Sequence, residues 1–258
     1  MKNESGHWYT PEGEPRHFVP RADGKGQRPT TLSDAKKLGL LPSVTGIIDR
    51  VMRKPALEKY LITQAVLAVA TAPDLPGESL DQKLVRILEE EQQADEEAAQ
   101  ARELGTQIHD ALESAVTGQC YFDELVPWVK PVADEVLKTW RPVVTEKVVV
   151  GPGYAGRVDL IVSATDTSVG IIDYKTTKKL PTNGSWPEHR LQLAAYAEAL
   201  DMHQHVDFVG NIYVSTTSPG EFDMFTWNDW HGDAEVFHHL FEVWKWMTGY
   251  HPVVVGGI

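Results

Sequence analysis

Two apolar runs decide the fold of this chain: GRVDLIV at residues 156–162 and VGIIDYK at residues 169–175. Both are rich in β-branched and aliphatic residues, and polar residues 163–168 separate them. This pattern predicts two antiparallel strands joined by a hairpin loop. If the loop is centred on Asp166, Asp159 and Asp173 lie directly opposite each other on neighbouring strands.

The opposed carboxylates indicate the chemistry. Directly paired side chains have Cβ atoms about 4.5–5.5 Å apart, where two like charges destabilise a sheet unless something offsets them. A hard, oxygen-seeking cation such as Mg²⁺ could bridge the two carboxylates. Lys175 follows Asp173 by two residues, so the strand period places its ammonium group on the same face. The hairpin therefore predicts a metal site with a lysine beside it.

An ion-pair ladder in contact with water is the alternative interpretation of the same residues, and such ladders contribute little stability. The neighbours Val158, Leu160, Ile171 and Ile172 favour a buried strand pair instead. An unneutralised pair of buried carboxylates would be costly, which favours the metal site.

The composition is that of a globular protein. With 258 residues and 42% hydrophobic content, the chain can form one large domain or one domain with an extension. Its single cysteine, Cys120, excludes a disulfide framework and an iron–sulfur cluster held by several cysteines, and it fits a reducing compartment. No apolar run approaches the roughly 20 residues of a membrane span, and residues 1–7 resemble neither a signal nor a transit peptide. We expect a cytoplasmic protein without membrane contact.

The net charge of −13 argues against a protein that coats nucleic acid through its overall field. The charge is unevenly distributed, since residues 1–60 contain 11 Lys and Arg against 7 Asp and Glu. Basic groups also gather at Lys175, Lys178 and Lys179. A local track for phosphates is one interpretation, and a solvated surface is the other.

The order of elements predicts an α/β fold. Residues 1–41 are expected to form an irregular arm or a short hairpin packed on the body, residues 42–118 a helical region and residues 119–258 an α/β core, all in one compact unit. Strands are expected at residues 143–150, in the hairpin, and at residues 207–215 and 221–227, with helices between and after them. Ser185 and Glu188 have the spacing of a capping box at the start of the helix that ends near Leu200. The arrangement predicts a mixed central sheet flanked by helices.

Two pairs of residues four apart on helices add candidate site residues. Gly105 and His109 lie one turn apart on one face of a helix. A glycine inside a helix suggests that another backbone approaches there, and His109 beside it is a candidate metal ligand. The alternative is an ordinary core or surface histidine. Gln192 and Tyr196 share a stripe of the later helix and could bind phosphates or hold Lys175 in place.

Four short motifs, taken in order, resemble those of the PD-(D/E)xK nuclease superfamily. They are Gly105-x3-His109, GRVD at 156–159, DYK at 173–175 and Gln192-x3-Tyr196. The branch most similar is that of RecB-like exonucleases, which includes the mitochondrial genome maintenance exonuclease and phage recombination exonucleases. The segment LPSVTGII at 41–48 is also similar to the opening of phage-type members. The resemblance implies a restriction-endonuclease-like α/β core with an N-terminal helical region. Val158 stands where the name of the motif has proline.

The resemblance also implies roles for individual residues. His109, Asp159, Asp173 and the main-chain carbonyl of Tyr174 would hold Mg²⁺ or Mn²⁺, and a histidine ligand favours Mn²⁺ somewhat. Lys175 would orient the attacking water and stabilise charge on the phosphate. Gln192 and Tyr196 would position the DNA backbone and the lysine. Apart from the resemblance, Glu146 and Glu113 are candidate ligands for a second ion, and Arg53, Lys54 and Lys59 near the N-terminal helices are candidates for contact with a DNA strand.

The sequence thus predicts a metal-dependent exonuclease that hydrolyses linear single- or double-stranded DNA in phage or bacterial recombination, repair or replication. A single-strand annealing or recombination protein would be a fitting partner. The alternatives are a catalytically silent binding module on the same fold, a structure-selective endonuclease at the same site, or a hydrolase of small phosphoesters.

Overall fold

The computed structural model describes residues 7–52, 55–164 and 167–253, apart from the side chains of residues 55–57, 60, 61 and 89–102. The chain divides into two units, one comprising Met1–Met52 with Ile108–Ile258 and the other Arg53–Gln107. This division differs from the one expected from sequence, because residues 42–52 and 108–118 belong to the same unit as residues 119–258.

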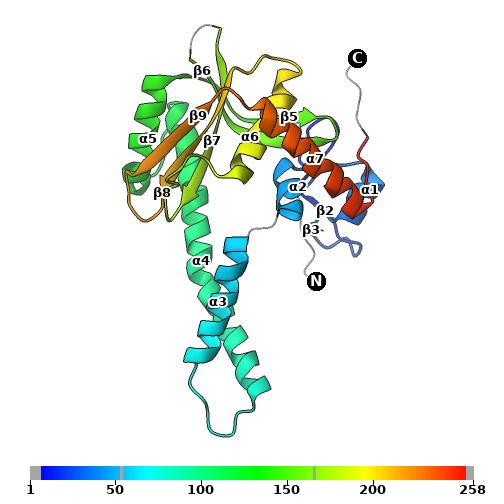
Figure 1. The fold of residues 1–258 in the computed structure, drawn as a ribbon, viewed down its shortest axis with the longest axis vertical. Helices are drawn as coiled ribbons and strands as arrows, with labels where there is room; N and C mark the ends of the chain where they lie inside the picture. The colour runs from blue at the N-terminus through cyan, green and yellow to red at the C-terminus, as the bar shows by residue number, and fades with distance from the viewer. Residues whose placement is uncertain (1–6, 53–54, 165–166, 254–258) are drawn as a thin grey trace. The chain divides into compact units, whose positions relative to one another are not determined.

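A five-stranded mixed sheet forms the centre of the larger unit (Figure 1). Its strands, in spatial order, are β5 (Arg141–Gly151), β6 (Tyr154–Ser163), β7 (Val169–Thr177), β8 (Phe208–Ser215) and β9 (Phe222–Trp227). Neighbouring strands are antiparallel except β7 and β8, which are parallel. The parallel pair needs a crossover, which helix α6 (Pro187–Asp201) provides. The predicted mixed sheet is confirmed.

The hairpin of β6 and β7 has the predicted register. Its cross-strand pairs include Leu160 with Ile172 and Ser163 with Val169. Asp159 and Asp173 are the next residues along the two strands, as a loop centred on Asp166 requires. Period-two alternation and β-branched side chains were sufficient to specify this local pairing.

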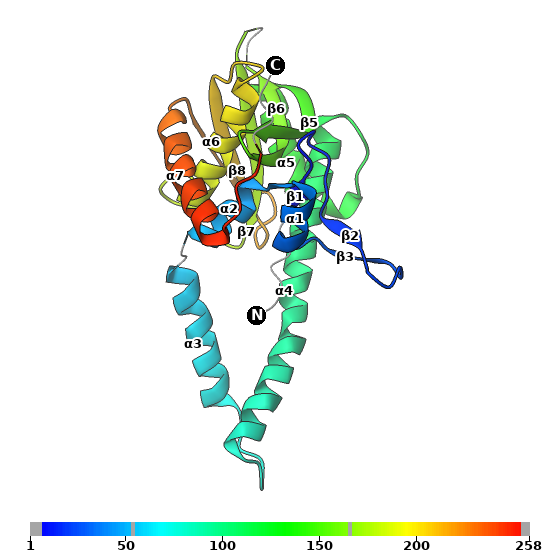
Figure 2. The ribbon, with the colours of Figure 1, turned by 90° about the vertical axis from the view of Figure 1, so that its right-hand side faces the viewer.

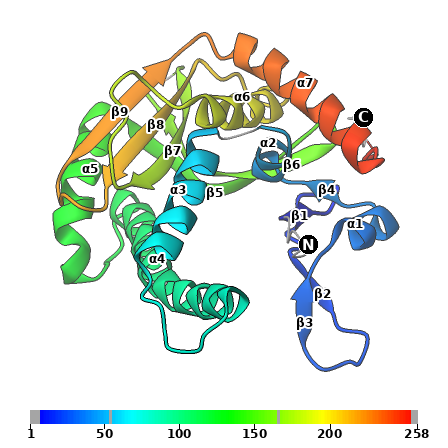
Figure 3. The same cartoon turned by 60° about the horizontal axis from the view of Figure 1, so that its bottom comes forward.

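Helices cover both faces of the sheet. Helix α6 lies on one face and α5 (Val126–Thr139) on the other (Figures 1 and 3). Small residues let α6 approach the strands closely, and its buried alanines are Ala194, Ala195, Ala197 and Ala199. Helices α2 (Val44–Val51) and α7 (His231–Thr248) pack against α6 and complete the main hydrophobic core.

The N-terminal segment is more regular than expected. Strand β1 (Trp8–Tyr9) pairs with β4 (Leu41–Pro42), and β2 (Phe18–Pro20) pairs with β3 (Gln27–Pro29) in a hairpin (Figure 2). Helix α1 (Leu32–Leu38) was not predicted. Thr31 and Asp34 form a capping box at its start, and Gly39 ends it with a φ of 66°. The short hairpin expected within residues 1–41 is present as β2 and β3. Helix α1, for which these capping signals suffice, is the part of the segment that was not expected.

The predicted capping box at Ser185 and Glu188 was also wrong. Trp186, not Ser185, is the N-cap residue of α6, and it makes no side-chain capping bond. The hydroxyl group of Ser185 donates a hydrogen bond to Oδ1 of Asn211, 2.8 Å away on β8. Ser185 thus makes a tertiary hydrogen bond to Asn211 instead of capping the start of α6.

The smaller unit contains α3 (Pro55–Thr71) and most of α4 (Leu80–Val116), which continues into the larger unit. A reciprocal pair of bonds between Ser79 and Gln82 caps the start of α4. A short 3₁₀ helix, η1 (Asp123–Leu125), precedes α5. Within the described residues, no helix combines the length and apolarity needed to cross a membrane.

Candidate active site

The two aspartates lie where β6 and β7 stop pairing. Leu160 and Ile172 form the last cross-strand pair, and beyond it the main-chain N–H of Tyr174 donates to Oδ2 of Asp159 at 2.8 Å. The carboxylate replaces a main-chain acceptor at this point. Asp159 is therefore fixed to the neighbouring strand beside Asp173.

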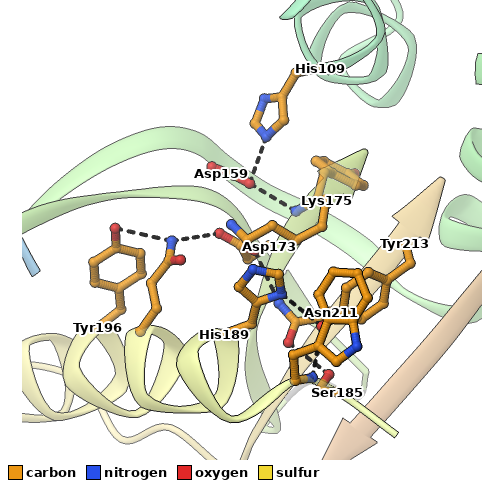
Figure 4. Close-up of polar contacts among 12 residues, drawn as sticks. His109, Asp159, Asp173, Lys175, Ser185, His189, Tyr196, Asn211 and Tyr213 are labelled. Atoms are coloured by element: carbon orange, nitrogen blue, oxygen red, sulfur yellow. Dashed lines mark hydrogen bonds and ion pairs between the residues drawn. The ribbon is translucent and has the colours of Figure 1, made fainter. Parts of the chain in front are cut away.

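Asp173 is almost completely buried and accepts three hydrogen bonds. Lys175 Nζ lies 2.6 Å and Asn211 Nδ2 3.0 Å from Oδ2, and Gln192 Nε2 donates to Oδ1 at 2.9 Å (Figure 4). Burial raises the pKa of Asp173, Lys175 opposes the shift and Asp159 adds to it, and the net value is about 6. The carboxylate can thus lose its proton near neutral pH and become a metal ligand.

Lys175 is held charged by its surroundings. Burial lowers its pKa, but Asp173 and Asp159 together outweigh burial, so the net shift is upward. The ammonium group is only partly exposed and forms an ion pair with Asp173. This is the position predicted from the strand period.

His109 approaches the hairpin from α4. Its Nε2 atom lies 2.9 Å from Oδ2 of Asp159. Burial lowers the pKa of His109, but the hydrogen bond and charge of Asp159 raise it to a net value of about 9. For Asp159, burial raises the pKa, and the bond from His109 with the charges of His109 and Lys175 lowers it overall. The Tyr174 ring meets His109 edge-on, with centroids 5.6 Å apart.

Glu146 is the fourth candidate metal ligand, after Asp159, Asp173 and His109. The pairs Thr145–Leu160 and Lys147–Val158 flank it, so Glu146 on β5 lies opposite Asp159. Its φ of 52° is in the left-handed region, which costs a non-glycine residue on the order of 1–3 kcal/mol. Ligand atoms of Glu146, His109 and Asp159 all lie within 4.8 Å of one another. Burial raises the pKa of Glu146, and Arg157 opposes this through an ion pair of 2.7 Å.

The donor set fits a divalent cation. The clustered ligand atoms are those of Glu146, Asp159 and His109, and Asp173 occupies the corresponding position next to Asp159 on β7. Carboxylate oxygens with one imidazole suit Mg²⁺ and, more closely, Mn²⁺. Glu113, the other candidate for a second ion, accepts a hydrogen bond from the Thr145 hydroxyl group at 2.8 Å and is not among these clustered ligands.

Gln192 and Tyr196 lie beneath the hairpin on α6. Gln192 Nε2 lies 3.3 Å from the Tyr196 hydroxyl group and also donates to Asp173. The Tyr196 ring packs so closely on Gly156 that a Cβ atom there would lie 2.1 Å from Cε1 of the ring. Gly156 thus lets α6 present Gln192 to the metal site.

Asn211 and Ser185 were not predicted to belong to the site. Asn211 is fully buried in an otherwise largely apolar strand, and it pairs with Asp173 across the parallel β7–β8 ladder. A buried amide in such a strand needs a partner, so Asn211 itself was a usable signal. The contact between Ser185 and Asn211 was not expected, because the sequence pattern assigned Ser185 to a capping box.

The structure does not test the three residues proposed for strand contact. Arg53 and Lys54 lie outside the described residues, and Lys59 is exposed on α3 in the smaller unit. Their contact with DNA stays a prediction, as does the ligand role of the Tyr174 carbonyl.

The sequence profile of the PD-(D/E)XK nuclease superfamily matches residues 123–242. Residues 123–242, a little under half of the chain, therefore resemble this superfamily in sequence. The match includes Asp159, Asp173 and Lys175 with Gln192 and Tyr196, whereas His109 precedes it. The superfamily expected from the four motifs is confirmed, and the phage-type branch stays a prediction.

Solved structures provide more distant comparisons. An alkaline exonuclease, LHK-Exo from Laribacter hongkongensis, has 12% identity and a TM-score of 0.35, covering 80% of this chain and 91% of its own. Its complex with dAMP has 15% identity and a TM-score of 0.30, covering 55% and 82%. The protein SSO0001 has 16% identity and a TM-score of 0.33, covering 48% of this chain and 60% of its own length. No curated protein sequence matches the chain.

Proposed function

We propose that this chain is a divalent-metal-dependent exonuclease of the PD-(D/E)XK superfamily that hydrolyses linear DNA. The observation that carries the proposal is the convergence of His109, Asp159, Asp173 and Lys175 from one helix and two strands. The match to the superfamily supports a nuclease role, and the donor chemistry supports dependence on Mg²⁺ or Mn²⁺.

His109, Asp159 and Asp173 would hold the cation, with Glu146 as a further ligand and the Tyr174 carbonyl completing the set. A bound divalent ion supplies a water of lowered pKa and neutralises charge on the phosphoryl oxygens. Ionised Asp173 and Asp159 bring negative charge to a buried position, which makes a cation favourable there.

Lys175 would contribute most directly among the protein groups. Its ammonium group donates to Oδ2 of Asp173 and can donate equally to a water or to a phosphate oxygen beside that carboxylate. Such a donor stabilises charge that develops on the phosphate during hydrolysis. Asn211 and Gln192 fix the orientation of Asp173, so the lysine and the carboxylate keep their relative positions.

Digestion of matched DNAs tests the proposal. Linear single- and double-stranded DNAs labelled at either end, together with a closed circle, are incubated with Mg²⁺, Mn²⁺ or chelator. Wild type is compared with Asp173→Asn and Lys175→Met, and with Asp229→Asn as a control at an exposed aspartate of the same unit. Binding of Mn²⁺ alone, measured by calorimetry, gives a readout that does not depend on activity.

We expect metal-dependent loss of linear DNA from an end, abolished in both site variants and retained in the control. The label released first gives the polarity. Cleavage of the closed circle would make the protein an endonuclease at the same site. Binding of DNA without cleavage in any metal would favour a silent binding module, and turnover of a chromogenic phosphodiester but not DNA would favour a small-phosphoester hydrolase.

A further inference from the structure

The connection between β7 and α6 joins the metal site to an exposed aromatic residue. Lys178 and Lys179 at its start are exposed. The hydroxyl group of Thr217 donates to the Lys178 carbonyl at 3.1 Å, and Thr177 bonds to the main chain of Lys179. Two exposed ammonium groups thus project from a main-chain segment that these hydrogen bonds hold in place.

Trp186 lies at the other end of this connection, as the N-cap residue of α6. Its main-chain N–H donates to the Tyr213 hydroxyl group at 3.1 Å. Its ring meets the Tyr213 ring at 5.2 Å and the His189 ring at 5.4 Å between centroids. The residue nevertheless keeps 36% of its surface exposed. The indole is therefore held in place while part of it remains open to solvent.

Trp186 is connected to the catalytic groups by two short routes. Tyr213, which its ring and main chain contact, is the partner of Lys175 in the β7–β8 ladder. Ser185, the preceding residue, bonds to Asn211, which in turn donates to Asp173. Figure 4 shows Ser185, His189 and Tyr213 gathered beside Asp173 and Lys175. The indole is thus linked to residues of the proposed metal site through Tyr213 and through Ser185 and Asn211.

A fixed, exposed indole with nearby cations has the features of a stacking platform for single-stranded nucleic acid. Bases stack on aromatic side chains largely without regard to sequence, and flanking lysines bind the phosphates. Bases inside a duplex already stack on their neighbours, so an unpaired or frayed base is the one free to use such a platform.

We propose that Trp186 stacks against an unpaired base of the DNA next to the cleaved phosphate, with Lys178 and Lys179 binding the adjoining backbone. This inference rests on the proposed function and adds to it a substrate class: single strands and frayed ends in preference to fully paired ones. If Trp186 served only for packing, its replacement would loosen the contacts with Tyr213 and His189 but would not remove a stacking contact with DNA.

The test is DNA binding by the full-length protein in the presence of chelator. Fluorescence anisotropy is measured with end-labelled single strands, with a blunt duplex, and with strands carrying one abasic residue at successive positions from the end. Wild type is compared with Trp186→Ala and Trp186→Phe. Trp246→Ala is the matched control, because Trp246 is 82% exposed on α7. Thermal unfolding of each variant checks that it folds.

Trp186→Ala is expected to weaken single-strand binding by about 5- to 100-fold, with Trp186→Phe retaining most of the affinity. The affinity of Trp186→Ala for the blunt duplex, and the affinity of Trp246→Ala for single strands, should stay close to those of wild type. One abasic position should weaken wild type but not Trp186→Ala, which a packing role would not produce. Equal loss by Trp186→Ala on abasic and intact strands, or no loss at all, would overturn the inference. Trp186-dependent binding in chelator, with no cleavage when Mg²⁺ or Mn²⁺ is then added, would uphold the inference and count against the proposed function.

Discussion

The Nε2 atom of His109 on α4 lies 2.9 Å from Oδ2 of Asp159 on β6. The same carboxylate oxygen accepts the main-chain N–H of Tyr174 on β7. One atom thus joins a helix to two strands of the sheet. The metal site we propose depends on this junction, and its protonation leads to the first two predictions.

Binding of Mn²⁺ at about pH 7.5 should release close to one proton from His109. The pKa of His109 is about 9, so the imidazole is protonated in the metal-free protein, and it must become neutral to coordinate a metal. Calorimetry in buffers of different ionisation enthalpy measures the release. His109→Gln should bind Mn²⁺ more weakly and release almost no proton, whereas the exposed His205→Gln control should match wild type. Equal release by wild type and His109→Gln would contradict the assignment.

The affinity for Mn²⁺ should fall more steeply below about pH 6 than above it. Between about pH 6 and 9 only the His109 proton competes, which costs about tenfold in affinity per pH unit. Burial raises the pKa of Asp173 to about 6, so this carboxyl also takes up a proton as the pH falls through 6 and ceases to be a ligand. Affinities measured from pH 5 to 8 give the slope. Asp173→Asn should lack the steeper part, and an unchanged slope in wild type would count against Asp173 as a ligand.

Glu146→Gln should weaken Mn²⁺ binding by roughly tenfold or more, while Glu113→Gln should leave it nearly unchanged. Glu146 shares a cluster with His109 and Asp159, but Glu113 is bonded to Thr145 outside that cluster. The two glutamates therefore form a matched pair, and calorimetry with Mn²⁺ alone compares them without reference to catalysis. If both variants bind like wild type, Glu146 is not a metal ligand.

Gly156→Ala should lower the free energy of unfolding by about 1–3 kcal/mol, the usual range for overpacking, and should also slow DNA cleavage. The added methyl group would meet the Tyr196 ring 2.1 Å away, which displaces α6 and the Gln192 contact with Asp173. Chemical denaturation and cleavage rates measure the two effects.

Gly232→Ala is the control for this substitution, because nothing lies within 4 Å of the position its Cβ atom would take on α7. In a Tyr196→Ala background, Gly156→Ala should cost less stability than it does in wild type, since the clash is then removed. An equal cost in both backgrounds would show that the tyrosine ring is not the obstacle.

The parts of the site that sequence predicted are those with local rules. The register of Asp159 and Asp173 follows from strand alternation and a centred loop, and Lys175 follows from the strand period. The pairing of β7 with β8 is different, because a crossover of about thirty residues separates the strands and local periodicity carries no register across it. Asn211 and Ser185 were therefore missed as partners of Asp173.

The same distinction explains the errors at helix starts. Ser185 and Glu188 have the spacing of a capping box, yet the hydroxyl group of Ser185 bonds to Asn211 on another element. Thr31 and Asp34 do form a capping box. The surrounding segment is rich in glycine and proline, so its composition did not indicate a helix. Local patterns give candidates for helix ends, and tertiary contacts decide among them.

One titration tests the central claim most directly. Mn²⁺ is added stepwise to the metal-free protein, with binding followed by calorimetry and the cleavage of an end-labelled linear DNA followed in parallel samples. We predict that cleavage rises with occupancy of the site, and that His109→Gln shifts both curves together to higher Mn²⁺ concentration. Cleavage that persists in chelator, or Mn²⁺ binding that saturates without any cleavage of linear DNA, would contradict the account.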